Sequence, residues 1–306
     1  MPKTCFYCRG AAVAADFGIP LWVPERVGLG GAPVEHLVAR ENPPPRVVES
    51  PVDQLPFGTL PHPALGDVQP GDRLREAIDA AIEERSELSL ADYSARSLCA
   101  ACAAALAELD AEAVPLLEPM VEGGARRYSP EEQAVLATWG ARAAYAVLTV
   151  ERKSAGVPRS HRRAVRERRL PHENAFVGFG RYRPNHIGVL ATRLLVPLEE
   201  EEDGVEAYSV LAVFGHLVLK VFGVHRRPTT TRVKAPEGLM VRFWPPQEEE
   251  LDWPPLWSMT ERSLEDAFLF EPFYRPFDYT KVRYQGPGKK VPVKRKRTEG
   301  LGPGRG

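Results

Sequence analysis

The chain has 306 residues, of which 43% are hydrophobic and 26% are charged, with a formal net charge of −1. This composition is typical of a soluble globular protein, and no apolar run reaches the roughly 18 residues that a membrane span requires. The near-neutral total hides acidic runs at 199–203 and 248–250 and basic stretches at 152–169 and 289–297. The first residues carry no apolar signal-peptide core, so we expect a cytoplasmic protein with reduced thiols and no membrane partner.

The first predicted elements follow a proline-rich stretch that extends to Pro70. A helix is predicted from about Asp72, because long and apolar side chains recur along one helical face. This face consists of Leu74, Ile78, Ile82 and Arg85. The segment 93–98 is predicted as a short strand. A second helix is predicted to begin at Cys99 and to end at Pro115, since proline disfavours helical backbone in the residue before it.

A third helix is predicted from Ser129. The run Ser129-Pro130-Glu131-Glu132 combines a capping box with a proline at the first helical position. An apolar stripe continues from there to Val150, and the opposite face is rich in alanine. A helix without a polar face is buried on most sides, so we expect this one to lie in the core.

Short β segments are predicted after Pro171, where β-branched and aromatic residues recur between turn signals. The expected strands are 175–182, 187–196, 207–214, 217–224 and 239–244. The connection Phe214-Gly215-His216-Leu217 fits either a tight turn or a bulge within one long strand. The last 20 or so residues are rich in Gly, Pro and Lys and are expected to be disordered.

The four cysteines of the chain form two Cys-x-x-Cys pairs, Cys5 with Cys8 and Cys99 with Cys102. Structural zinc takes four ligands in a tetrahedron, and thiolates suit it well. The second pair begins a predicted helix, whose free N–H groups stabilise the negative charge of four thiolates. The pattern therefore predicts one structural Zn²⁺ held by all four. The alternatives are buried reduced thiols and a redox pair, although the βαβ context of a redox pair is missing.

A knuckle near the N-terminus, a loop or hairpin, and a second knuckle at a helix start follow the order of a treble-clef zinc finger. We therefore predict an α+β protein with a treble-clef-like zinc module and a proline-rich insertion at 1–125. A buried helix and a mostly antiparallel β domain are expected at 126–285. A disordered basic tail is expected at 286–306.

These pieces resemble HNH-type (His-Me finger) endonuclease-like proteins of bacteria and phages. In that family a first knuckle precedes a Glu-His pair, a Pro and a Trp, and a second Cys-x-x-Cys runs into Asn and a helix that often ends in Leu-Glu. Here Cys5-Phe6-Tyr7-Cys8 precedes Asp16-Phe17-Gly18-Ile19-Pro20-Leu21-Trp22. Similarly, Cys99-Ala100-Ala101-Cys102 runs into Ala103 and later Leu109-Asp110. The resemblance covers roughly the first half of the chain.

Two positions depart from the family pattern, and both carry its chemistry. The family needs a histidine to deprotonate the attacking water and a divalent cation to stabilise the leaving oxygen. This chain has Phe17 and Ala103 at the corresponding positions. The resemblance therefore implies a nuclease scaffold with degenerate catalytic positions. One Glu-His pair, Glu35-His36, lies further along the same segment and would supply the base if the alignment shifted.

A basic stretch between Arg152 and Arg169 contains eight Arg or Lys residues and one acid, Glu167. If the part after Pro158 is helical, five arginines share one face: Arg159, Arg162, Arg163, Arg166 and Arg169. Such a stripe suits a DNA or RNA phosphate backbone, and the basic tail at 289–297 adds a second basic element. The alternative is a solvated helix surface neutralised by the acidic runs.

Together these features predict a noncatalytic nucleic-acid-binding or assembly protein built on a degenerate HNH-like zinc scaffold. One alternative is an active metal-dependent endonuclease that uses His36. Another is a structural component that binds a protein partner and uses zinc as a staple. A basic surface free of acidic neighbours favours the first reading, and a cluster of carboxylates or histidines beside the zinc helix favours the second.

Overall fold

A computed structural model describes the protein at residues 4–28, 34–39, 82–88, 93–151, 154–167, 170–198, 201–225, 238–245 and 247–261. It also describes the shorter pieces 232–233, 263–264, 267, 273–274 and 283–284. The predicted tail at 286–306 lies outside the described residues. Within them, no helix is long and apolar enough to cross a membrane.

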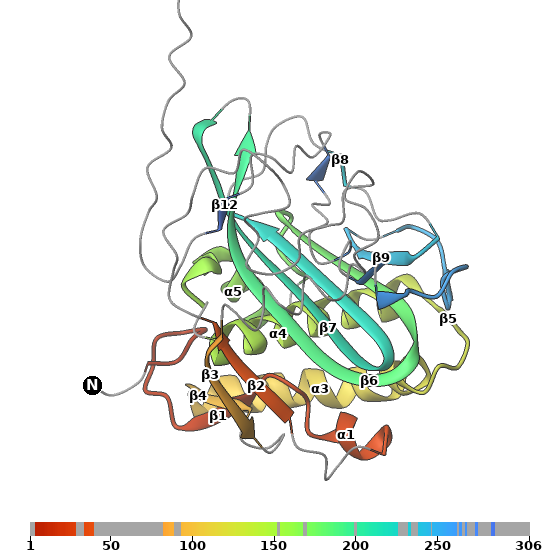
Figure 1. The fold of residues 1–306 in the computed structure, drawn as a ribbon, viewed down its shortest axis with the longest axis horizontal. Helices are drawn as coiled ribbons and strands as arrows, with labels where there is room; N and C mark the ends of the chain where they lie inside the picture. The colour runs from red at the N-terminus through yellow and green to blue at the C-terminus, as the bar shows by residue number, and fades with distance from the viewer. Residues whose placement is uncertain are drawn as a thin grey trace, which may run out of the picture.

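Two long antiparallel strands dominate the architecture (Figure 1). They are β6 (Ala175–Leu198) and β7 (Glu201–Val224), which pair along most of their length. On its other edge β6 pairs with β9 (Met240–Trp244) and β12 (Arg283–Tyr284), also antiparallel. Helices cover this sheet, so the protein belongs to the α+β class, as the sequence predicted.

The four strands predicted at 175–182, 187–196, 207–214 and 217–224 form two continuous strands, β6 and β7. The residues 214–217 lie inside β7, so the bulged reading is the correct one of the two. The register shifts where Arg181 faces Leu217 and His186 faces Gly215, which places the extra residues in β6. Gly215 has a φ of 65°, and a Cβ there would lie 2.6 Å from the carbonyl oxygen of Val121. Glycine therefore lets the strand bend closely past the neighbouring helix.

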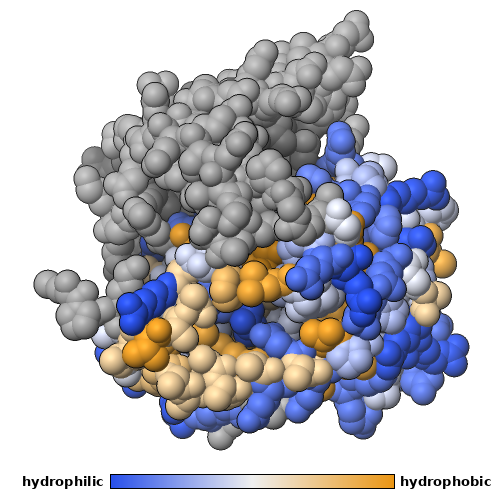
Figure 2. Space-filling model, turned by 90° about the horizontal axis from the view of Figure 1, so that it is seen from below, coloured by the Kyte–Doolittle hydropathy of each residue, from blue (hydrophilic) through white to orange (hydrophobic). Residues whose placement is uncertain are grey.

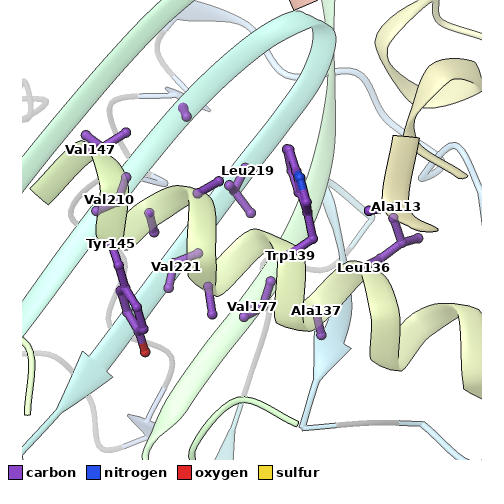
Figure 3. Packing of buried hydrophobic residues seen from close by; sticks show 14 of the residues in the cluster. Ala113, Leu136, Ala137, Trp139, Tyr145, Val147, Val177, Val210, Leu219 and Val221 are labelled. Atoms are coloured by element: carbon purple, nitrogen blue, oxygen red, sulfur yellow. The ribbon is translucent and has the colours of Figure 1, made fainter. Parts of the chain in front are cut away.

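The central helix α4 (Pro130–Val150) forms as predicted. Ser129 caps it, with its hydroxyl accepting from the Glu132 N–H while the Glu132 carboxylate accepts from the Ser129 N–H. Trp139, Tyr145 and Val147 belong to the buried side chains that α4 contributes to its contact with the sheet (Figure 3). A Cβ on Gly140 would lie 2.9 Å from Val177 of β6, so glycine permits the close approach.

The helix α3 (Ala100–Val121) lies beside α4 and continues through Pro115 and Pro119, so the predicted end at Pro115 is wrong. Proline lacks the N–H that would bond the carbonyl four residues earlier. The guanidinium of Arg126 instead donates to the freed carbonyl of Pro115 at 3.2 Å. The hydroxyl of Tyr128 donates to the next carbonyl, that of Leu116, at 2.8 Å. These partners come from β5 (Arg126–Tyr128), the strand that follows the helix.

The N-terminal region consists of two small antiparallel ladders. The strand β1 (Ala14–Phe17) pairs with β4 (Ser94–Leu98), which confirms the strand predicted at 93–98. The strand β2 (Val34–Ala39) pairs with β3 (Ile82–Leu88). Residues 82–85 of the helix predicted from Asp72 therefore belong to a strand, because pairing with β2 overrides a weak helical spacing. The rest of that predicted helix, 72–81, lies outside the described residues.

Smaller elements complete the fold. They are α1 (Trp22–Arg26), η1 (Ser154–Gly156), α5 (Arg159–Arg166), β8 (Arg232–Val233), β10 (Leu251–Trp253) and β11 (Phe273–Tyr274). The strand β10 pairs with β5, and β11 pairs with β8. One buried cluster includes Cys5 of the first knuckle, Leu106 of α3, Trp139 of α4 and Phe214 of β7. The apolar core is thus continuous from the cysteine region to the sheet.

Candidate metal centre and basic face

The four cysteines converge on one point, as the two Cys-x-x-Cys pairs predicted. Their Sγ atoms all lie within 4.8 Å of one another, and the Cys8 and Cys99 sulfurs are 3.5 Å apart. Sulfurs that bind one tetrahedral zinc lie about 3.8 Å apart, since each Zn–S bond measures about 2.3 Å. The cluster could therefore hold a metal ion. Within the part of the chain that the structure describes, no other group of three or more His, Cys, Asp or Glu residues could do so.

Local backbone geometry positions the first two sulfurs. The N–H of Cys5 donates to the Gly10 carbonyl at 2.6 Å, and the N–H of Arg9 donates to the Cys5 carbonyl at 2.9 Å. The N–H of Gly10 points at the Cys8 sulfur at 3.4 Å. The chain thus folds into a tight knuckle around the Cys8 sulfur. The N–H of Phe6 donates to the Ser97 carbonyl at 2.8 Å, which ties the knuckle to β4.

The other two sulfurs stand at the start of α3. Cys99 is its N-cap, and its sulfur accepts from the Cys102 N–H at 3.5 Å. This hydrogen bond, against the opposing effect of burial, lowers the pKa of the Cys99 thiol to about 7. Burial raises the pKa of the Cys102 thiol. A bound cation would displace both protons, and the start of α3 would then help to stabilise the resulting thiolates.

The positions aligned with the catalytic residues of the HNH family carry no polar side chain. Phe17 ends β1, and Ala103 lies in the first turn of α3. The neighbouring acids serve a different purpose. Asp16, 1% exposed, lies 3.0 Å from Nη2 of the buried Arg142 on α4. Asp110 on α3 lies 3.3 Å from the same nitrogen. An Asp–Arg–Asp triad, in which Asp16 and Arg142 are buried and Asp110 is half-buried, therefore joins β1, α3 and α4.

The outward face of α3 offers no replacement for the missing groups next to the cysteines. Its exposed small residues are Ala100, Ala101, Ala104, Ala107 and Ala111. Figure 2 views the molecule from the underside of Figure 1, where α3 lies, and shows a broad band of apolar atoms on this face.

The fallback pair Glu35-His36 lies in β2, where Glu35 pairs in register with Glu87 and His36 with Ser86 of β3. The structure describes the backbone of this ladder, and the side chains of both residues lie outside the described part. The role of His36 as a base therefore stays a prediction.

The basic helix predicted after Pro158 is present as α5, but its arginines divide into two groups. Arg159, Arg163 and Arg166 are exposed. Arg162 turns inward, where Nη1 donates to the Phe6 carbonyl at 3.1 Å and the guanidinium covers the Phe6 ring. Arg162 therefore contacts the knuckle, and its predicted role in nucleic-acid binding stays a prediction. The helix ends at Arg166, and Arg169 lies outside the described residues.

Acidic neighbours neutralise this helix only in part. Arg163 pairs with Glu167 at 2.7 Å. From the acidic run at 248–250, Glu250 lies 3.6 Å from Arg127 of β5, which also pairs with Asp252. In Figure 1, β5 lies at the opposite side of the molecule from α5. The side chains of the run at 199–203 lie outside the described residues.

Two features of this region were not predicted from the sequence. Arg9 is exposed and directly follows the knuckle with a φ of 66°. His161, on the inner side of α5, stacks on His172 at 4.4 Å between ring centroids, and its Nδ1 forms a 2.8 Å hydrogen bond with the Tyr208 hydroxyl. His161 and His172 are 11 residues apart, a spacing that fits no helix or strand repeat, so sequence spacing gave no signal for this pair. For Arg9, the position directly after Cys-x-x-Cys was the available signal.

The metal centre and the basic helix are thus adjacent, whereas the family's catalytic groups are replaced. No family model, no curated protein and no solved structure matches this chain. The resemblance to HNH-type proteins therefore depends on the residues quoted from the sequence alone.

Proposed function

We propose that this protein is a noncatalytic nucleic-acid-binding protein, built on a treble-clef-like module that holds one structural Zn²⁺. The observation that carries the proposal is the position of α5, which packs against α3 and exposes Arg159, Arg163 and Arg166 beside the cysteine cluster. Guanidinium groups on a rigid helix suit phosphate oxygens, and such contacts bind a backbone without reading its sequence.

The donor set supports zinc over other divalent metals. Four sulfurs in a compact cluster suit a soft, tetrahedral site, whereas Mg²⁺ and Ca²⁺ prefer oxygen ligands. The order of elements supports the treble-clef comparison: a knuckle, the β1–β4 ladder, and a second knuckle at the start of α3. The zinc holds these parts together and supplies no open coordination position for chemistry.

Two assays on the purified full chain test the proposal. Fluorescence anisotropy with 20-base-pair DNA and RNA duplexes should detect binding at 50 mM salt that weakens steeply by 200 mM. Supercoiled plasmid with Mg²⁺, Mn²⁺ or Ni²⁺ should stay uncut. Cleavage that the His36→Ala variant loses would instead support the endonuclease alternative. If no binding is detected at 50 mM salt, the results would instead favour the structural alternative, in which zinc stabilises a protein-binding component.

A further inference from the structure

Arg9 is held by the same loop that presents the first two cysteines. Its φ of 66° lies in the left-handed region, which residues with a side chain rarely adopt. The bonds from Arg9 N–H to the Cys5 carbonyl and from Cys5 N–H to the Gly10 carbonyl fix this conformation. The backbone position of Arg9 therefore depends on the closed knuckle, which a bound metal stabilises.

Arg162 joins this loop to α5. Its guanidinium carbon lies 4.9 Å from the centroid of the Phe6 ring, three residues before Arg9, while its Nη1 bonds the Phe6 carbonyl. Arg159 lies one helical turn before Arg162, on the same side of α5. Arg162 thus ties the turn of α5 that carries Arg159 to the knuckle that carries Arg9. Burial, then the charge of Arg9, then that of Arg159, lower the pKa of Arg162.

No acid balances this junction within the described part of the chain. The one ion pair of α5 there joins Arg163 to Glu167, and Glu250 and Asp252 pair with Arg127. Like charges held together raise the free energy of the unbound protein and create a positive potential at the surface. An anion bound by both Arg9 and Arg159 would relieve this repulsion and gain charge-assisted hydrogen bonds.

We propose that Arg9 and Arg159 form a phosphate-binding pair, and that metal occupancy of the cysteine cluster controls this pair by setting the position of Arg9. The inference rests on the proposed function and adds its regulation: the metal-loaded protein holds a nucleic-acid backbone with both the knuckle and α5, whereas the metal-free protein holds it with α5 alone. The shared ligand chemistry is the phosphodiester group of DNA or RNA.

The experiment measures the salt dependence of duplex binding for the metal-loaded full chain and its variants. Each lost phosphate contact should reduce the steepness of log K against log salt by about 0.9. The ratio of wild-type to variant affinity should therefore change about 3.5-fold between 50 and 200 mM salt. We expect this loss for Arg9→Gly and for Arg159→Gln. Glycine adopts the left-handed conformation freely, so Arg9→Gly removes the charge without straining the knuckle. Arg9→Lys should keep the slope, and Arg127→Gln, at the opposite side of the molecule, is the matched control.

The metal arm compares wild type and Arg9→Gly before and after chelation, with DNA and RNA duplexes in parallel and metal content measured. Chelation should lower the wild-type slope by about 0.9 and leave the Arg9→Gly slope unchanged. If chelation lowered the slope equally in both proteins, the proposal that the metal controls the position of Arg9 would be wrong. A wild-type slope for Arg9→Gly, with a reduced slope for Arg159→Gln, would overturn the pair while the proposed function stands. Absence of all binding would overturn the proposed function itself.

Discussion

Replacing His161 with glutamine isolates one contribution to the acid sensitivity of this protein. The imidazole is fully buried between α5, α4 and β7. Its Nδ1 bonds the Tyr208 hydroxyl at 2.8 Å, which in turn lies 3.1 Å from the Tyr145 hydroxyl. His172 stacks on its ring, and Nε2 has no hydrogen-bond partner in the described part of the chain. Within the described residues no carboxylate pairs with this imidazole, so a positive charge on it would be uncompensated. Glutamine can keep a hydrogen bond to Tyr208 without titrating.

The size of the effect follows from the pKa. Burial, followed by the charges of His172 and His225, lowers the pKa of His161 from 6.5 to about 3. In the unfolded chain His161 binds a proton below about pH 6.5, whereas in the folded chain it binds one only below about pH 3. The contribution of the neutral His161 to the free energy of unfolding is fully present above pH 6.5. It is lost as the pH falls from 6.5 toward 3. Between pH 7.5 and pH 5, this one group should remove about 2 kcal/mol from the free energy of unfolding.

Urea denaturation at pH 7.5 and pH 5 measures this contribution. The wild type should lose about 2 kcal/mol more than His161→Gln over this interval, whatever the variant costs at pH 7.5. Burial also raises the pKa values of Asp16 and Asp110, but both proteins share these groups, so the comparison cancels them. His172→Gln, which removes a half-buried ring, should show a smaller difference. Equal pH dependence in wild type and His161→Gln would refute the reasoning.

Two further predictions concern the metal centre and the triad. Cys99→Ser removes one ligand and the sulfur acceptor at the N-cap of α3, so elemental analysis should show zinc falling well below one ion per chain, with thermal unfolding of the N-terminal region at lower temperature. Arg142→Met should cost about 3 kcal/mol in urea denaturation, because the buried Asp16 and the half-buried Asp110 lose their counterion. Adding Asp16→Asn and Asp110→Asn should recover much of that loss, and no recovery would contradict this account.

Local signals in the sequence predicted the parts of the fold that local contacts determine. The capping box at Ser129 lies within four residues, and α4 begins there as predicted. Each Cys-x-x-Cys pair is likewise local, and two isolated pairs imply a common ligand. The assignment failed where the decisive partner is distant. The helix α3 continues through Pro115 and Pro119, and Arg126 donates to the Pro115 carbonyl, which Pro119 leaves without a helical N–H partner. Tyr128 adds a hydrogen bond to the neighbouring carbonyl of Leu116. Propensity rules for proline do not include such partners from outside the helix.

The basic helix illustrates the same limit at the candidate site. Helical spacing placed Arg162 with its neighbours, and the arginines do lie on one short helix. Spacing does not reveal that the Phe6 carbonyl and ring lie against one part of that face. Nor does it place Arg9, more than a hundred residues earlier, near Arg162. Which arginines are free to bind a ligand depends on tertiary contacts that sequence spacing leaves open.

The Asp–Arg–Asp triad also bears on the endonuclease alternative. A catalytic cation would need carboxylate or imidazole ligands near the knuckle, and Asp16 and Asp110 are the acids that the family comparison places there. Both already face Arg142, whose side chain is 7% exposed. A divalent cation brought within about 4 Å of that guanidinium would be repelled by several kcal/mol even at a high effective dielectric constant. If His36 reached this site as a base, the cation that stabilises the leaving oxygen would still have no ligands among the described residues. Asp16 and Asp110 thus act as counterions of Arg142 in this structure.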